Sequence, residues 1–198
     1  GRDAARKEAS KLNVPRIGVR FRLPASMNQV EYFGRGPAEN YLDRNAGSMI
    51  GLYKSTAEEL YFPYVRPQEN GHHTDTRWVS LSTGKKGLLI QADNTIGFNA
   101  LRNSIEDFDD EEATGLSRQW SNFTPEQVAN HDEAAAKNVL RRQHHINDIT
   151  PCDFVEVCVD LKQQGVAGYD SWGSRPEPAY TLPANREYNW GFTLIPLK

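Results

Sequence analysis

Apolar and polar residues alternate with a period of two in several segments of this chain. Such alternation is typical of β-strands that bury one face. Turn residues separate the segments, notably a Gly-Lys-Lys run after Thr83. The first half of the chain therefore predicts one hairpin after another. The predicted strand segments are residues 15–24, 30–33, 61–65, 78–81 and 87–91.

The last third of the chain carries the clearest strand patterns. Apolar side chains at every second position predict two core strands of an antiparallel sheet. We expect Trp190 to be buried in the second of these strands. A long loop rich in Gly and Pro, residues 163–178, lies between them, and long loops inside compact domains are usually functional or disordered. The alternating positions are Val155, Val157, Val159 and Leu161 in the first strand and Tyr188, Trp190, Phe192 and Leu194 in the second.

One helix is predicted, over residues 124–140. Thr124 caps it, Pro125 occupies its first position, and Gln127 closes a capping box. We expect a mainly β fold with this one helix. Residues 1–14 read as a lead-in segment, and residues 15–198 as a single domain.

The composition argues against some classes of binding partner. A net charge of -3 gives no broad positive field for nucleic acid or an anionic membrane surface, and no apolar run is long enough for a membrane-spanning helix. The absence of an initial Met suggests a processed or excised chain, so the bacterial cytoplasm and periplasm both stay open. Cys152 and Cys158 lie too far apart along a strand to form a disulfide with each other.

A Gly-rich segment of the long loop carries Trp172 beside Asp170. Sugar rings present apolar C–H faces, and a flat indole stacks on such faces with little loss of rotamer freedom. Trp172 is therefore a candidate sugar platform, and Asp170 a candidate sugar ligand. The alternative is that Trp172 fixes the loop to the sheet, and spacing alone leaves both open.

Residues 67–73 combine the planar polar groups of Glu69, His72 and His73. Glu69 and His73 are candidate sugar ligands, although a role in hydrogen bonding the turn is the simpler interpretation. Adjacent histidines on an extended chain point to opposite faces, so they do not predict a metal site. No pair of carboxyl groups can be nominated for glycosidic cleavage, and no nucleophile elbow, phosphate loop or thiolate metal motif is present in the sequence.

Several long, unusual motifs stand in the sequence, namely PRIG at residues 15–18, GRGPAENYLDR at residues 34–44, PYVRPQENG at residues 63–71 and DSWG at residues 170–173. Taken together, they closely resemble the C-terminal small-chain domain of the large β-galactosidases of glycoside hydrolase family 2. The resemblance continues in order through residues 160–197.

The resemblance implies a large antiparallel β-sandwich of the galactose-mutarotase type, called a supersandwich. It also implies a retaining glycosidase in which a separate (β/α) barrel carries both catalytic glutamates. In that family, the Trp that matches Trp172 stacks on galactosides bound in the barrel's pocket. Members often use Mg and Na ions and form homo-oligomers. We therefore expect no cofactor or metal in this segment and no catalytic residue of its own.

Two other functions stay open. The fold kinship also suits a self-sufficient aldose epimerase, with His73 or His145 and Glu69 as acid and base. A carbohydrate-binding module, whose aromatic loop only grips a polysaccharide, is the third interpretation.

Overall fold

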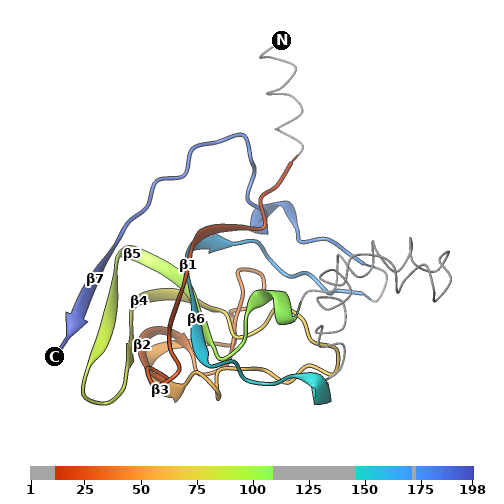
Figure 1. Ribbon diagram of the computed structural model, residues 1–198. Coiled ribbons are helices and arrows are strands. Elements are labelled where there is room, and N and C mark those ends of the chain that lie inside the picture. Colours follow the sequence, from red (N-terminus) through yellow and green to blue (C-terminus); the bar gives the residue numbers. More distant parts are fainter. Residues whose placement is uncertain (1–11, 109–145, 171–172) are drawn as a thin grey trace, which may run out of the picture. The chain divides into compact units, whose positions relative to one another are not determined.

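A computed structural model describes residues 12–108, 146–170 and 173–198 of the chain. It contains a mainly β fold built on one antiparallel sheet, in the order β1-β6-β5-β4-β2-β3, with β7 also paired to β5 (Figure 1). The predicted fold class is thus confirmed, whereas the helix predicted at residues 124–140 lies outside the described residues. The strands are β1 (Arg16–Pro24), β2 (Gln29–Gly36), β3 (Met49–Thr56), β4 (His73–Ser82), β5 (Gly87–Leu101), β6 (Phe154–Gln163) and β7 (Phe192–Leu197).

Short 3-10 helices are the only helical elements among these described residues, namely η1 (Ile105–Asp107), η2 (Ile146–Asp148) and η3 (Pro178–Tyr180). None of them is long and apolar enough to cross a membrane.

By its contacts the chain divides into two compact units, and all strands belong to the larger one. The smaller unit comprises Pro63–Glu69 and Asn103–Cys152. Within its described part, Asn103 donates to the Thr150 carbonyl at 3.0 Å, and the Ser104 N–H donates to the Asp107 carboxylate at 2.8 Å. Hydrogen bonds between side chains and the backbone can order a short irregular segment that pairs with no strand.

Strand β5 is the centre of the sheet because it pairs with different neighbours along its length. Its first half, Gly87 to Ala92, pairs with β7, and its second half, Gly97 to Leu101, pairs with β6. On its other side β4 follows it with two register shifts, and there Asp75 adopts a φ of 52°. Such bulges bend a strand and increase its twist.

Alternation along β2, β4 and β5 builds the core. Tyr32 pairs with Val79, which pairs with Ile90, and all three are almost fully buried. The Tyr32 ring also makes an edge contact with Phe98, with centroids 5.1 Å apart. Because aromatic pairs of this geometry contribute about 0.5–1.5 kcal/mol beyond area burial, the cluster stabilises the bend in β4.

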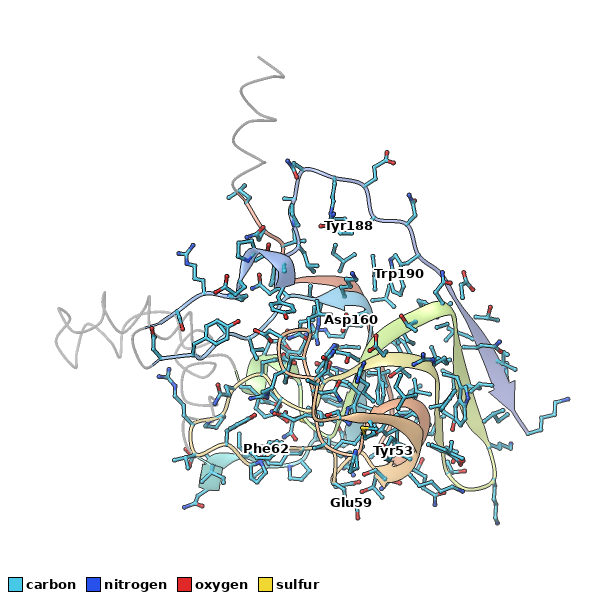
Figure 2. All side chains as sticks on the ribbon, turned by 180° about the vertical axis from the view of Figure 1, so that it is seen from behind. Tyr53, Glu59, Phe62, Asp160, Tyr188 and Trp190 are labelled. Atoms are coloured by element: carbon cyan, nitrogen blue, oxygen red, sulfur yellow. The ribbon has the colours of Figure 1, made fainter. Side chains whose placement is uncertain are left out.

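The two C-terminal strand predictions have different outcomes. Strand β6 forms as expected, with Val155, Val157 and Val159 fully buried. The second strand begins at Phe192 instead of Tyr188, and Trp190 is half-buried where full burial was predicted. Tyr188 and Trp190 lie on the extended segment that leads into β7 (Figure 2).

The ladder between β5 and β7 ends at the Ala92–Phe192 pair. One further backbone hydrogen bond follows it, from the Asp93 N–H to the Gly191 carbonyl at 3.1 Å. The Asp93 carboxylate occupies the space that a Cβ on Gly191 would need, so a residue with a side chain does not fit at position 191 in this arrangement.

The opposite face of β6 carries charged residues into the interior. Glu156 and Asp160 are 3% and 1% exposed, and both are paired with arginines of β1. Arg16 lies 3.0 Å from Asp160, and Arg22 lies 3.1 Å from Glu156. A buried carboxylate without a partner costs several kcal/mol, so loss of either arginine would destabilise the pairing of β1 with β6.

Asn99 on β5 extends this network to the segment before β4. Its side-chain oxygen accepts from Arg16 at 2.6 Å and from His72 Nδ1 at 2.8 Å, and its amide donates to the Asn70 carbonyl at 2.8 Å. Since an amide oxygen can only accept, His72 carries its proton on Nδ1. Burial, and next the positive charge of Arg16, lower the pKa of His72 from 6.5 to about 3.

The network predicts an acid-sensitive stability. Because the pKa of His72 is lower in the folded state, the unfolded chain binds more protons between about pH 6.5 and 3. This contribution is fully present above pH 6.5 and is lost as the pH falls towards 3. Burial also lowers the pKa of His73. Urea unfolding between pH 7 and 5 should therefore show a free energy of unfolding that falls by up to about 1.4 kcal/mol per pH unit for each of the two histidines.

His72→Asn should make the unfolding free energy depend less steeply on pH, because one of the two histidines no longer contributes. This holds even if the variant is less stable at every pH. An unchanged slope in the folded variant would contradict a neutral His72.

Candidate functional site

The long loop after β6 begins with a series of backbone contacts. The Gln164 N–H donates to the Pro15 carbonyl at 2.8 Å, and the Gly165 N–H donates to the Tyr180 carbonyl at 2.8 Å. The next two N–H groups, of Val166 and Ala167, donate to the carboxylate of Asp43 at 3.1 and 2.8 Å. Four consecutive residues are thus bound to three different segments of the larger unit.

Beyond these contacts the loop projects side chains into solvent. Tyr169 is 56% exposed and Asp170 is also exposed, with one Asp170 carboxylate oxygen accepting from the Ser174 N–H at 3.3 Å. Trp172 lies outside the described residues. Sequence reasoning did not single out Tyr169, although an aromatic residue beside Gly168 is the same signal that drew attention to Trp172.

The segment that supplies Asp43 is itself anchored. The Asn40 side-chain oxygen accepts from the Thr74 N–H at 2.9 Å and from the Thr74 hydroxyl at 2.6 Å, and the Asn40 N–H donates to the His72 carbonyl at 2.7 Å. Glu39 accepts from the Gly71 N–H at 2.7 Å and from Arg44 at 2.7 Å. The GRGPAENYLDR and PQENG motifs, distant in sequence, therefore brace each other here.

His73 does not reach solvent. Its side chain is 1% exposed, stacks on Phe98 with centroids 5.0 Å apart, and has a ring nitrogen facing each of the Gly71 and Pro37 carbonyls at 3.1 and 3.3 Å. His72 points to the other side of the strand, against Tyr41 and Asn99. This geometry suits a structural role for His73 better than direct contact with a sugar.

The remaining candidate residues are Glu69 and His145. Glu69 is half-buried and belongs to the smaller unit. His145 lies outside the described residues. Nowhere in the described ranges do three or more His, Cys, Asp or Glu side chains gather closely enough to hold a metal ion.

A second surface feature lies on the face of the sheet opposite the Tyr32 core. Leu52 of β3, Phe33 of β2 and Trp78 of β4 form a cross-strand row on this face, and Trp78 pairs next with Gln91 of β5. The Leu89–Ile195 pair of β5 and β7 lies on the same face, two residues away from Gln91 along β5. Leu52 is 59% exposed and Phe33 is also exposed. We call this apolar surface the second face. A hollow of about 380 Å³ on it is lined by Glu31, Trp78, Ser80, Leu89, Gln91 and Leu197.

Comparison with known proteins agrees with the motifs. Residues 3–194 match the protein family described as beta galactosidase small chain. A beta-galactosidase of Priestia megaterium is 35% identical over 185 residues, covering 93% of this chain and 15% of that relative. Beta-galactosidases of Arthrobacter sp. and Vibrio cholerae are 40% and 29% identical over 53% and 91% of this chain.

This chain spans only about one seventh of the length of these relatives, since the matches cover 15%, 11% and 14% of them. The family match itself covers nearly all of the chain, and the same motifs that brace the Asp43 segment fall inside it. The chain belongs to the β-galactosidase small-chain family.

Proposed function

We propose that this chain is the C-terminal domain of a longer β-galactosidase and completes the galactoside-binding pocket of a catalytic barrel in that polypeptide. It does not cleave the glycosidic bond itself. The observation that carries the proposal is the loop after β6, which is fixed at its base by four backbone contacts and projects Tyr169 and Asp170 into solvent. A braced, exposed loop is what a domain needs in order to contribute to a pocket outside its own core.

The residue types of the loop suit a sugar. Trp172 would stack on the apolar face of galactose, and Asp170 would accept a hydrogen bond from a hydroxyl. Tyr169 offers a second amphipathic ring next to them. These roles contribute binding energy only. A domain that completes a pocket does not have to provide a proton-transfer step or a nucleophile.

The second face supports a place inside a larger polypeptide. Antiparallel sheets usually cover an apolar face with another layer and leave polar faces to water. Here one face carries apolar side chains, although Val79 and Ile90 already form a core on the other face. The apolar residues are Leu52, Phe33, Trp78, Leu89 and Ile195, and they lie among Glu31, Ser80 and Gln91. The relatives are about seven times longer than this chain, so we propose that another segment of the same polypeptide covers the second face.

The burial of His73 weakens the epimerase alternative, because a general acid or base has to reach its substrate. The hollow beside Trp78 is the observation that favours a carbohydrate-binding module, since it combines an indole with a carboxylate and an amide. The ligands of the proposed pocket are galactosides. The parent enzyme would form a homo-oligomer and would bind Mg and Na through residues elsewhere in its chain.

The first test concerns catalysis. The purified 198-residue chain should hydrolyse no chromogenic galactoside, because the proposal places both catalytic carboxylates outside it. It should also not accelerate the spontaneous interconversion of galactose anomers. Activity that copurifies with the chain through several columns would contradict the proposal. Binding of polysaccharide, but not of short galactosides, would select the binding module.

The second test concerns Trp172. In the full-length polypeptide, Trp172→Ala should raise KM for a galactoside by roughly 5-fold or more, since a lost stacking contact is worth about 1 kcal/mol. Thermal unfolding of the 198-residue chain should shift little, because the proposed platform faces a bound sugar and not the core. Phe62→Ala is the matched control, as Phe62 is an aromatic residue, 45% exposed, outside the loop. A large loss of stability with unchanged kinetics would show that Trp172 is structural.

The third test concerns the second face. Leu52→Glu should change the unfolding free energy of the 198-residue chain by only about 0.5 kcal/mol, because the side chain is mostly exposed there. In the full-length polypeptide it should lower the unfolding temperature by several degrees, because it would bury a charge under the covering segment. Leu12→Glu, at 60% exposure but away from this face, should change neither. If Leu52→Glu and Leu12→Glu give the same unfolding temperature in the full-length protein, no segment covers the second face.

A further inference from the structure

We propose that Asp43 is a positioning residue for galactoside binding, because its carboxylate fixes the backbone of the loop that follows β6. This inference rests on the proposed function of that loop. Asp43 belongs to a turn more than a hundred residues earlier in the chain, and its role would be to set where the exposed part of the loop begins.

The carboxylate uses both of its oxygens on consecutive amides. Oδ1 accepts from the Val166 N–H at 3.1 Å, and Oδ2 accepts from the Ala167 N–H at 2.8 Å. Hydrogen bonds from N–H groups to an ionised carboxylate are about twice as strong as those between neutral groups. One side chain therefore fixes the direction of two successive peptide planes.

The loop backbone is shaped to receive this anion. Ala167 has a φ of 56° and Gly168 a φ of 87°, so two successive residues adopt the left-handed region. A turn of this kind directs neighbouring N–H groups towards one point, which forms an anion-binding concavity. Because a left-handed alanine is unfavourable by itself, the bond from its N–H to Asp43 helps to hold the conformation.

Gly165 brings the two segments into close contact. A Cβ at this position would collide with an oxygen of the Asp43 carboxylate, so a larger residue cannot coexist with the observed arrangement. Gly165 is thus required by a close approach of the Asp43 side chain and not by its own backbone angles.

Asp43 also stands on a rigid base. Tyr41 and Arg44, on either side of it, exchange backbone hydrogen bonds at 3.2 and 2.8 Å, and Arg44 is held by Glu39 at 2.7 Å. The side chain of Glu39 is 6% exposed and accepts from the Gly71 N–H. Displacement of the carboxylate would therefore disturb several buried contacts, which makes it a fixed reference for the loop.

Asp43 would act on affinity and not on chemistry. Its two oxygens are already bonded to the backbone, and Asp170 follows Ala167 closely in the chain. Removal of the carboxylate leaves two amide donors without their acceptor and allows the exposed part of the loop to sample other positions. Ordering the loop again on binding costs free energy, which appears as a higher KM with little change in kcat.

The clamp is tested first in the 198-residue chain by hydrogen exchange. The amides of Val166 and Ala167 should exchange at least about 10-fold faster in Asp43→Ala than in the wild type, since both lose their acceptor. Asp43→Asn, which keeps one acceptor oxygen, should give an intermediate rate. Gly47→Ala is the control, because a Cβ at Gly47 meets nothing within 4 Å. Wild-type exchange in Asp43→Ala would overturn the inference.

The consequence is tested by galactoside kinetics of the full-length polypeptide. Asp43→Ala and Gly165→Ala should each raise KM by roughly 3- to 10-fold while kcat changes less than about 2-fold, and Gly47→Ala should match the wild type. Combined with Trp172→Ala, Asp43→Ala should raise KM little further, because both changes remove one contribution.

The outcomes separate this inference from the proposed function. If Trp172→Ala leaves KM unchanged, the proposed function of the loop is wrong. If Trp172→Ala raises KM but Asp43→Ala and Gly165→Ala do not, the loop binds galactoside and Asp43 does not position it. Fully additive effects of Asp43→Ala and Trp172→Ala on KM would also overturn the positioning role.

Discussion

The fold of the larger unit depends on how β6 satisfies the two carboxylates that it carries inside. Glu156 and Asp160 lie on the face opposite Val155, Val157 and Val159, so this strand is buried on both faces. On one side β6 pairs with β5, and on the other side β1 supplies Arg16 and Arg22 to its two carboxylates. Arg22 is the register partner of Glu156, whereas Arg16 reaches Asp160 across a register shift. Compensation of these buried charges therefore favours β1 at this edge of the sheet, where it lies beside β6 (Figure 1).

The same network sets the position of the candidate loop. Asp160, labelled in Figure 2, lies three residues before the end of β6, and Gln163, which closes the strand, accepts from Arg16 at 2.6 Å. Arg16 and His72 share the oxygen of Asn99, and the backbone of His72 binds Asn40. Asn40 and Glu39 brace the turn that presents Asp43 to the loop. A chain of hydrogen bonds through Asn99 and Asn40 therefore connects the charges buried in the sheet to the base of an exposed loop.

Features that depend only on periodicity could be predicted from the sequence. Alternation identified the strand from Val155 to Leu161, and the opposite orientation of His72 and His73 could be inferred from their adjacency. The late start of β7 was missed because alternation alone does not show where the pairing with β5 ends, at the Ala92–Phe192 pair. Trp190 is therefore half-buried, although its position in the alternation indicated a core residue.

The candidate site shows the same division. Asp170 was recognisable from its loop, and its exposure agrees with that setting. The bracing by Asp43 could not be foreseen, because a carboxylate in a turn motif does not reveal which distant amides it will accept from. Burial of His73 was equally hidden, since its polar neighbours in the sequence resemble those of a sugar site while its spatial neighbours are Phe98 and Tyr32.

Under the proposed function, these contacts explain how the domain would contribute to galactoside binding without cleaving the bond itself. A loop that is free before binding has to be ordered when substrate arrives, and each side chain that is immobilised costs about 0.5–1.5 kcal/mol. The contacts of residues 164–167 with Pro15, Tyr180 and Asp43 are made during folding, so the base of the loop is ordered before any ligand binds. Under the proposed function, the stacking and hydrogen-bond energy of the exposed residues would then be available for a galactoside. The stability of the buried Arg16–Asp160 network and the affinity of the loop would be linked, because both depend on the same strand end.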